Sequence, residues 1–368
     1  MKIDRVKVNI HLDNLIYNYR LLQKIYNDKE VMAVVKANAY GHGSVKCAKF
    51  LAENGCKYFA VTELKEAIEL RKAGIDSDIL IFGKTEPRNL NYLFKYDITQ
   101  TVDSYAYAKI LNNKNYPIKT QIILDTGMSR FGIYLHDAND IEEAKLETIK
   151  ILKLNYLNNQ GIYTHFSSAD ENDPDFTNQQ YLIFNKLIKV IENEDYNLKL
   201  KHCSNSAGII NHSDKNLSMV RAGIALYGYP PTSTSYEFKP VMEVLAKVIA
   251  IREIKPGDSV SYGRKYIAKQ KQRIATVAIG YADGYSRHFG AGDYFYYKTY
   301  RFFVVGRVCM GTTMVKIDNV NIKVGDFVEV FGNKKSLNEL ATRVKTIPYE
   351  LLTNMAKKRA NYHYIKNS

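Results

Sequence analysis

Short apolar segments alternate with amphipathic segments from residue 1 to about residue 230. The apolar segments are bounded by Gly, Asn, Asp or Ser, which is typical of short strands buried on both faces. Between them lie helix patterns, of which the clearest has apolar side chains at three- and four-residue spacing from Tyr181 to Ile191. The pattern predicts strands at 31–36, 58–61, 79–82, 98–102, 120–125, 161–165, 199–203 and 219–221.

Strand–helix units repeated eight times in about 230 residues predict an α/β fold with an N-terminal (β/α)8 TIM barrel. An open doubly wound sheet is the alternative, because periodicity alone does not distinguish the two. Polar residues fall at or just beyond the carboxyl ends of several expected strands: Lys36, Asp125, His165, His202 and Arg221. In a barrel these ends converge on one mouth, where catalytic residues are found.

The pattern changes at the Pro/Ser/Thr stretch 230–235, which is typical of a linker. Beyond it, segments rich in β-branched and aromatic residues are separated by Gly-Asp and Gly-Asn turns. The chain is therefore expected to divide into residues 1–230, the barrel, and residues 231–368, a C-terminal mostly-β domain.

Composition excludes several classes of protein. Hydrophobic residues make up 46% of the chain, too many for wholesale disorder, and no apolar run approaches the roughly 20 residues of a membrane-spanning helix. The N-terminus lacks an apolar signal core. The cysteines show neither C-x-x-C spacing nor disulfide density, so a reducing, cytoplasmic location is expected.

The formal net charge of +14 is concentrated in residues 231–368, which hold 23 Lys and Arg against 11 Asp and Glu. The excess indicates either a binding surface or an overall composition that is rich in Lys, Asn and Tyr. A basic nucleic-acid-binding protein is the hypothesis from another class. No recognition motif accompanies the charge, so neither nucleic acid nor a membrane is expected as a partner.

A strongly apolar strand ends on Lys36. One interpretation is a lysine that extends into solvent. The other is a buried amine with a depressed pKa, ready to form a Schiff base with an aldehyde cofactor. Glycines follow at 41 and 43, where they let the backbone approach a ligand closely, and the Tyr40 hydroxyl is suited to a phosphate.

Other candidates lie near further strand ends. Ser206, in the sequence HCSNSAG, either caps a helix or contributes to an anion site. Arg221 either forms a buried salt bridge or, with the N–H of Gly223, faces a phosphate. Arg130 lies in a glycine-flanked loop suited to a carboxylate. His165 is a core histidine by default, and no metal is expected because further ligands at zinc spacing are lacking.

Taken together, these segments resemble the alanine racemase family. The sequence VKANAYGHG around Lys36 is similar to the family's pyridoxal-phosphate attachment motif. In family order and spacing it is followed by DTGMSRFG, THFSSADE, HCSNSAG, VRAGIALYG, VSYGRKY, IGYADGY and GRVCM. The resemblance spans nearly the whole chain. It implies a TIM barrel and a β domain joined in a homodimer, with each active site shared between one barrel and the partner's β domain.

The resemblance also implies pyridoxal 5'-phosphate as the cofactor, held by Lys36 as an internal aldimine. Its phosphate would be bound by Tyr40, Ser206 and the N–H groups of two residues near Arg221. Arg221 would face the pyridine nitrogen, and His165 would hydrogen-bond Arg221 and the catalytic tyrosine. The implied cofactor-binding residues are Lys36, Tyr40, His165, Asn205, Ser206, Arg221, Gly223 and Ile224.

Racemisation removes a proton from one face of Cα and delivers one to the other, so a base is needed on each side of the cofactor. In the family pattern Lys36 acts on the D face and Tyr262 of the partner subunit acts on the L face. Arg130 and the N–H of Met310 would bind the substrate carboxylate, and Tyr281 would line a small pocket. The implied function is the interconversion of L- and D-alanine, supplying D-alanine for peptidoglycan.

Three positions depart from the family pattern. Ile123 stands where a lysine, often carbamylated, is common, and Gly311 stands where an aspartate is usual. Lys357 stands where a phosphate-binding tyrosine is usual. These departures leave a second hypothesis open, in which the cofactor is kept and the substrate is serine or a basic amino acid.

Overall fold

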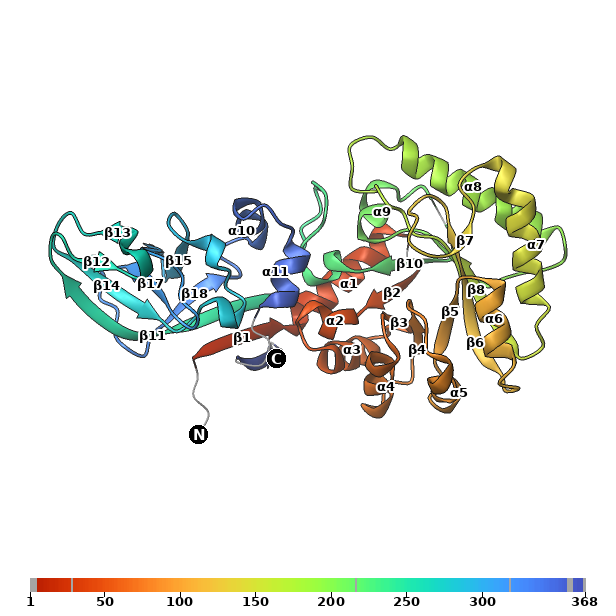
Figure 1. Ribbon diagram of the computed structural model, residues 1–368, viewed down its shortest axis with the longest axis horizontal. Coiled ribbons are helices and arrows are strands. Elements are labelled where there is room, and N and C mark those ends of the chain that lie inside the picture. Colours follow the sequence, from red (N-terminus) through yellow and green to blue (C-terminus); the bar gives the residue numbers. More distant parts are fainter. Residues whose placement is uncertain (1–4, 28, 216, 318, 356–359, 367–368) are drawn as a thin grey trace. The chain divides into compact units, whose positions relative to one another are not determined.

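The computed structural model describes residues 5–27, 29–215, 217–317, 319–355 and 360–366 (Figure 1). These residues form two compact units. The first contains residues 15–39 and 43–238, and the second contains residues 5–14, 40–42 and the chain from residue 239 onward. In the described part of the chain, every helix is too short or too polar to cross a membrane.

Parallel strands form the centre of the first unit, in the order β10-β2-β3-β4-β5-β6-β8-β9, with the short β7 (Ile133–Tyr134) beside β6. Their bounds are β2 (Glu30–Val34), β3 (Tyr58–Val61), β4 (Asp78–Ile81), β5 (Thr99–Val102), β6 (Ile118–Asp125), β8 (Leu157–Tyr163), β9 (Leu200–His202) and β10 (Met219–Ala222). The last strand, β10, pairs with the first, β2. Between β9 and β10, Ser218 N–H donates to the Lys201 oxygen (3.1 Å) and Arg221 N–H donates to the Ser204 oxygen (3.0 Å).

The predicted TIM barrel is therefore confirmed. β10 pairs with β2 on one side, and hydrogen bonds join the β9 and β10 segments on the other, so the strands encircle a common axis and the open doubly wound sheet is excluded. The strands are parallel and largely buried, as their short apolar segments predicted.

Helices surround the strands of this unit (Figure 1). They are α1 (Leu12–Ile25), α3 (Ser44–Glu53), α4 (Leu64–Lys72), α5 (Asn91–Lys95), α6 (Tyr105–Asn112), α7 (Ile141–Leu152), α8 (Asp175–Glu192) and α9 (Ser206–Asn211). The longest, α8, buries Phe184, Leu187, Ile188 and Ile191, so the apolar stripe expected from the sequence is the face that packs inward.

The second unit is mostly β-structure, as expected. Its larger sheet has the order β16-β15-β18-β11-β1-β19, and β14 and β17 extend it from β11. The bounds are β1 (Val6–His11), β11 (Met242–Ile254), β14 (Gln272–Val277), β15 (Tyr294–Tyr297), β16 (Tyr300–Phe303), β17 (Thr313–Lys316), β18 (Phe327–Phe331) and β19 (Asn361–Ile365). A small sheet of β12 (Ser259–Val260) and β13 (Tyr266–Ile267) and the helices α10 (Leu337–Arg343) and α11 (Pro348–Asn354) complete it.

The strand β1 lies in the sheet of this second unit. Val8 pairs with Val244 of β11 in antiparallel register and with Tyr362 of β19 in parallel register. The sequence-based division at residues 230 and 231 assigns β1 to the barrel segment. Its alternating burial, with Val6, Val8 and Ile10 inside, is the pattern of a strand with one covered face rather than a barrel strand.

An ion pair lies in the core of the second unit. The amine of Lys335 donates to the carboxylate of Asp293, and both side chains are fully buried. The amine also donates to the backbone oxygen of Tyr294 (2.6 Å), and the other carboxylate oxygen of Asp293 accepts from the Tyr285 hydroxyl. The pair joins the turn after β18 to the start of β15.

Candidate active site at the barrel mouth

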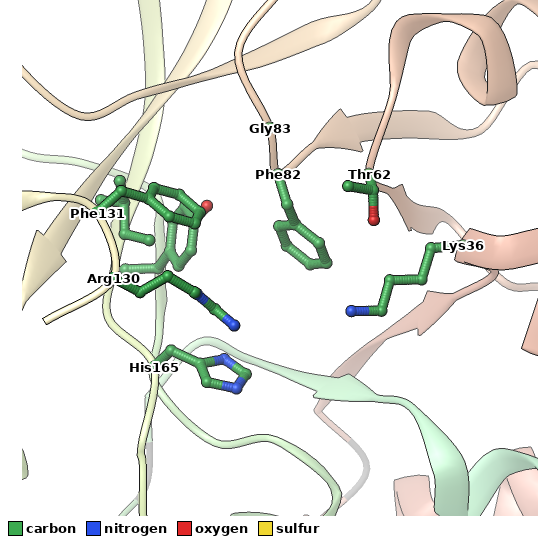
Figure 2. Close-up of a pocket in the computed structure, with 9 residues that line it drawn as sticks. Lys36, Thr62, Phe82, Gly83, Arg130, Phe131 and His165 are labelled. Atoms are coloured by element: carbon green, nitrogen blue, oxygen red, sulfur yellow. The ribbon is translucent and has the colours of Figure 1, made fainter. Parts of the chain in front are cut away.

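A cavity of about 240 Å³ lies within the first unit, where the barrel strands end. Figure 2 shows the side chains of Lys36, Arg130 and His165 extending into the same space from different elements. The lining residues are Lys36, Thr62, Phe82, Gly83, Ile123, Arg130, Phe131, Tyr163 and His165. The structure therefore brings together candidates that are separated by up to about 130 residues in the sequence.

Lys36 stands two residues beyond the end of β2. The N–H of Val35 donates to the Ala60 oxygen of β3 (2.9 Å), so the ladder fixes the backbone up to the lysine. Burial lowers the pKa of the Lys36 amine, the charge of Arg130 lowers it further, and the Glu66 carboxylate opposes both. A lysine of this kind carries more of the unprotonated, nucleophilic amine near neutral pH than a lysine in solvent does.

A turn of left-handed helix follows Lys36. All four residues have φ between +52° and +56°: Ala37, Asn38, Ala39 and Tyr40. This conformation costs a non-glycine residue roughly 1–2 kcal/mol. Side chains hold both ends of the turn, because Glu66 Oε1 accepts the N–H of Ala37 (2.6 Å) and Asn38 Oδ1 accepts the N–H of Ser44 (2.9 Å).

Arg221 is the last residue but one of β10 and is buried, with 2% of its surface exposed. It donates to Nδ1 of His202 (2.6 Å), to Nδ1 of His165 (3.0 Å), and to the backbone oxygens of Thr164 and Cys203 (2.9 Å each). All four acceptors are neutral, so these bonds do not form the buried salt bridge that was one of the expected alternatives. Burial lowers the pKa of Arg221 to about 10, which still leaves the guanidinium charged at neutral pH.

Both histidines that contact Arg221 are neutral and have a defined tautomer. A guanidinium only donates, so Nδ1 of each imidazole accepts and the proton resides on Nε2. The Nε2–H of His202 then donates to Oε1 of Gln121 (2.7 Å). Burial and the charge of Arg221 hold the pKa of both histidines well below its usual value. His165 lines the cavity, and its Nε2–H is a donor for a group bound there.

Of the expected phosphate-binding residues, Ser206, Gly223 and Ile224 lie together near the start of α9. The hydroxyl oxygen of Ser206 accepts the N–H of Gly223 (3.0 Å), just before the 3-10 turn Ile224–Tyr227. Asn205 caps α9 by accepting the N–H of Gly208 (3.0 Å). Ser206 and the backbone at Gly223 therefore form a compact set of polar groups, with Asn205 supporting the helix that carries the serine.

Arg130 is positioned by a loop that folds around Asp125, the last residue of β6. The guanidinium lies over the ring of Phe131, 5.2 Å from its centre. Nε2 of His136 lies 3.4 Å from Asp125 Oδ1. The same oxygen accepts three backbone N–H bonds of 3.0–3.1 Å, from Gly127, Met128 and Ser129. A carboxylate with several backbone donors is a strong anchor for a tight loop.

The departures from the family pattern have different structural outcomes. Ile123 is buried on the cavity wall and cannot bond to Arg130 as a polar side chain would. The loop that carries Arg130 is held by the carboxylate of Asp125. Gly311 contributes its backbone oxygen, which accepts from Arg5 (2.6 Å). Lys357 lies outside the described residues.

Four candidates belong to the second unit: Tyr40, Tyr262, Tyr281 and Met310. Burial raises the pKa of Tyr40, so its hydroxyl stays protonated and can donate. Tyr262 is 70% exposed and Met310 61%, which is unusual for such large side chains. The N–H of Ala282 donates to the Met310 oxygen (2.9 Å), so Tyr281 and Met310 belong to adjoining segments.

The turn that carries Tyr262 is anchored to the GRVCM segment. The hydroxyl of Ser261 donates to the Arg307 oxygen (2.6 Å). The residues on either side of Tyr262 are left-handed, with φ of +67° at Ser261 and +70° at Gly263. Glycine is favoured at 263 because its φ is positive, whereas the nearest atom to a Cβ there would be the movable guanidinium of Arg307, 3.2 Å away.

Sequence reasoning missed several residues of the site. Glu66 contacts the backbone beside Lys36, and Gln121 accepts the Nε2–H of His202. Thr62 and Phe82 line the cavity from the ends of β3 and β4. The sequence did contain a signal for these two residues, because Thr62 directly follows an expected apolar strand and Phe82 is the last residue of another. Glu66 gave no such signal, because a glutamate in the first turn of a helix is ordinary.

The mouth of the barrel holds a half-buried lysine, Lys36, and two arginines, Arg130 and Arg221. A barrel with such a site, followed by a β domain, is typical of a two-domain enzyme. Residues 10–231 match the family model for the alanine racemase N-terminal domain, and residues 241–364 match the model for the C-terminal domain. The alanine racemase of Clostridium tetani is 38% identical, over 98% of this chain and 96% of the relative. That of Methanococcus maripaludis is also 38% identical, over 93% and 94%.

Solved structures agree with the sequence relatives. The alanine racemase of Clostridium difficile 630 superposes with a TM-score of 0.93 at 36% identity, covering 99% of this chain and 96% of that one. An alanine racemase from Bartonella henselae, described with covalently bound pyridoxal phosphate, gives 0.88 at 27% identity, covering 99% and 100%. The chain belongs to the alanine racemase family, whose members are pyridoxal-phosphate-dependent amino-acid racemases.

Proposed function

We propose that this protein interconverts L-alanine and D-alanine with pyridoxal 5'-phosphate as its cofactor. The observation that carries the proposal is the cavity at the barrel mouth, where the amine of Lys36 shares one space with Arg130 and with His165. A nucleophilic amine and a carboxylate-binding guanidinium are the two groups that an amino-acid racemase of this family needs on one side of its substrate.

The residues present fit pyridoxal phosphate. Lys36 would bind the aldehyde, and Tyr40, Ser206, Gly223 and Ile224 would bind the phosphate. Arg221 would face the ring nitrogen, since its partners in the protein are neutral and its charge favours an unprotonated, electron-rich acceptor. When bound, the cofactor supplies an electron-withdrawing ring that acidifies the Cα–H of an attached amino acid.

Two bases on opposite faces of Cα would move the proton. Lys36 takes or gives the proton on the D face, because burial and Arg130 favour its neutral form. Tyr262 of the partner subunit acts on the L face, and the Nε2–H of His165 donates to its oxygen and stabilises the phenolate. Arg130 holds the substrate carboxylate, assisted by the N–H of Met310, while Tyr281 limits the space for the substrate side chain.

The proposal includes a homodimer with shared sites. It is supported by the high exposure of Tyr262 and Met310, which suits side chains that a partner covers. Mixing Lys36→Ala chains with Tyr262→Phe chains tests this. Random exchange should restore about a quarter of the wild-type activity, because half of the dimers are hybrids with one intact site of two. If each chain instead held its own Lys36–Tyr262 pair, mixing would restore nothing.

The activity itself is tested with a panel of L-alanine, L-serine and L-lysine in the presence of pyridoxal phosphate. The expected result is racemisation of alanine with exchange of solvent deuterium at Cα, and its loss in Lys36→Ala. Lys46→Ala, an exposed lysine on α3, is the matched control and should keep full activity. If the enzyme clearly preferred L-serine or L-lysine, that amino acid and not alanine would be its substrate.

We further propose that the enzyme acts in the cytoplasm and supplies D-alanine for peptidoglycan. Restored growth of a bacterial strain that requires external D-alanine, upon expression of this chain, would support that role. Failure to restore growth while the purified chain racemises alanine would separate the role from the activity.

A further inference from the structure

Glu66 lies in the first turn of α4 and has no role in the proposed chemistry. Its two carboxylate oxygens accept three backbone N–H bonds. Oε1 accepts from Ala37 (2.6 Å), and Oε2 accepts from Thr62 (2.9 Å) and Glu63 (3.1 Å). The second oxygen performs ordinary capping of α4, in a reciprocal capping box with Glu63. Oε1 instead accepts from a separate segment, the left-handed turn that begins directly after Lys36.

That turn requires an external acceptor. It contains four non-glycine residues in a conformation that costs each of them roughly 1–2 kcal/mol, and such strain persists only where the surroundings fix it. The ladder hydrogen bonds of β2 end at Val35, and Ala37 is the next residue but one. The Ala37 N–H is therefore the first backbone donor beyond Lys36, and a charged acceptor holds it.

We propose that Glu66 is a positioning residue for Lys36, fixing the lysine's backbone through the N–H of Ala37 so that its amine faces Arg130 and His165. This inference rests on the proposed function, in which Lys36 binds the cofactor. The charge of Glu66 also acts on the Lys36 amine directly. It raises the pKa of the amine, whereas burial and Arg130 lower it.

Two substitutions separate this role from simple capping of α4. Glu66→Asp keeps a carboxylate in the first turn, where it can still cap α4, but its side chain is one methylene too short to contact Ala37 as well. Glu63→Ala does the reverse, removing one half of the capping box and leaving the contact with Ala37. If Glu66 positions Lys36, only Glu66→Asp should affect the lysine. If Glu66 only caps α4, both Glu66→Asp and Glu63→Ala should affect it, each in proportion to the stability it loses.

The measurement is the rate at which the full-length chain, freed of cofactor, binds pyridoxal 5'-phosphate at Lys36. Absorbance follows the reaction, and borohydride fixation with peptide mapping confirms the residue. Glu66→Asp should slow the reaction about tenfold, the size expected for losing a hydrogen bond to a charged group. Glu63→Ala should react at the wild-type rate. Equal slowing in both variants would overturn the inference, and so would a wild-type rate in Glu66→Asp.

The pH dependence of the same rate provides a readout that helix capping does not affect. Glu66→Gln removes the charge that raises the Lys36 pKa, so the midpoint of the profile should move to lower pH. An unmoved midpoint would contradict the electrostatic part of the inference. If the wild-type chain itself fixed no cofactor at Lys36, the proposed function would fail, and this inference with it. Fixation in the wild type with unaffected Glu66 variants overturns the inference alone.

Discussion

The left-handed turn after Lys36 makes an unusual prediction, namely that a glycine substitution stabilises the protein. Ala37 is exposed and has a φ of +52°, so replacing it with glycine removes a methyl group that packs against little and relieves the conflict between Cβ and the backbone. In an ordinary helix the same substitution is destabilising, because glycine loses more conformational freedom on folding.

The magnitude follows from these two opposing contributions. An L-residue in the left-handed conformation costs roughly 1–2 kcal/mol, and glycine avoids that cost. The additional entropy that glycine loses on folding costs about 0.5–1 kcal/mol. Ala37→Gly should therefore increase the free energy of unfolding by about 0.5–1 kcal/mol. The hydrogen bond from residue 37 to Glu66 is unaffected, because it uses the backbone N–H.

The assay is urea unfolding at fixed concentrations of protein and pyridoxal phosphate, with Ala106→Gly as the control. Ala106 is also exposed but lies in the right-handed helix α6, so its substitution should lower the midpoint. The two variants should thus move the midpoint in opposite directions with the same slope. If Ala37→Gly lowered the midpoint as much as Ala106→Gly, the turn would not be strained.

Three further predictions concern buried groups. Lys335→Met should destabilise the protein by about 3–5 kcal/mol, because it leaves the fully buried carboxylate of Asp293 without its cation. Urea unfolding measures this change, and a loss of stability below about 1 kcal/mol would contradict the prediction. His202 is held neutral with a lowered pKa, so the unfolded chain binds its proton more readily, and stability should fall as the pH drops below about 6.5. His202→Gln should make the unfolding free energy less steep against pH in that range, and an unchanged slope would oppose this. Burial raises the pKa of the Cys47 thiol to about 12, so iodoacetamide at pH 8 should label Cys47 only after unfolding, as peptide mapping would show.

The sequence predicted the barrel well because each of its strands is a short apolar segment whose two faces are both covered. It also predicted which polar residues converge, since Lys36, His165 and Arg221 lie within two residues of the carboxyl ends of such segments. The assignment of cofactor and substrate roles depended on the resemblance to a family. Residue type alone left each of these side chains with an ordinary structural interpretation.

Two features were beyond sequence reasoning for physical reasons. The left-handed turn has no glycine at 37–40 and only Asn38 is of a type that favours this conformation, so the signal was weak, and a contact with distant Glu66 stabilises the turn. Lys335 lies in the polar sequence Gly-Asn-Lys-Lys-Ser, which is typical of an exposed turn, yet its side chain is fully buried. Long-range electrostatic partners override local composition in both cases.

The pairing of β1 has a consequence for synthesis on the ribosome. Val8 leaves the ribosome early, but its partner Val244 follows more than 230 residues later and Tyr362 later still. The barrel, whose strands pair mostly with their neighbours in sequence, can form while the chain is being made. β1 must stay unpaired at least until β11 has been synthesised, and its short length and its lysine at position 7 disfavour pairing with other strands until then.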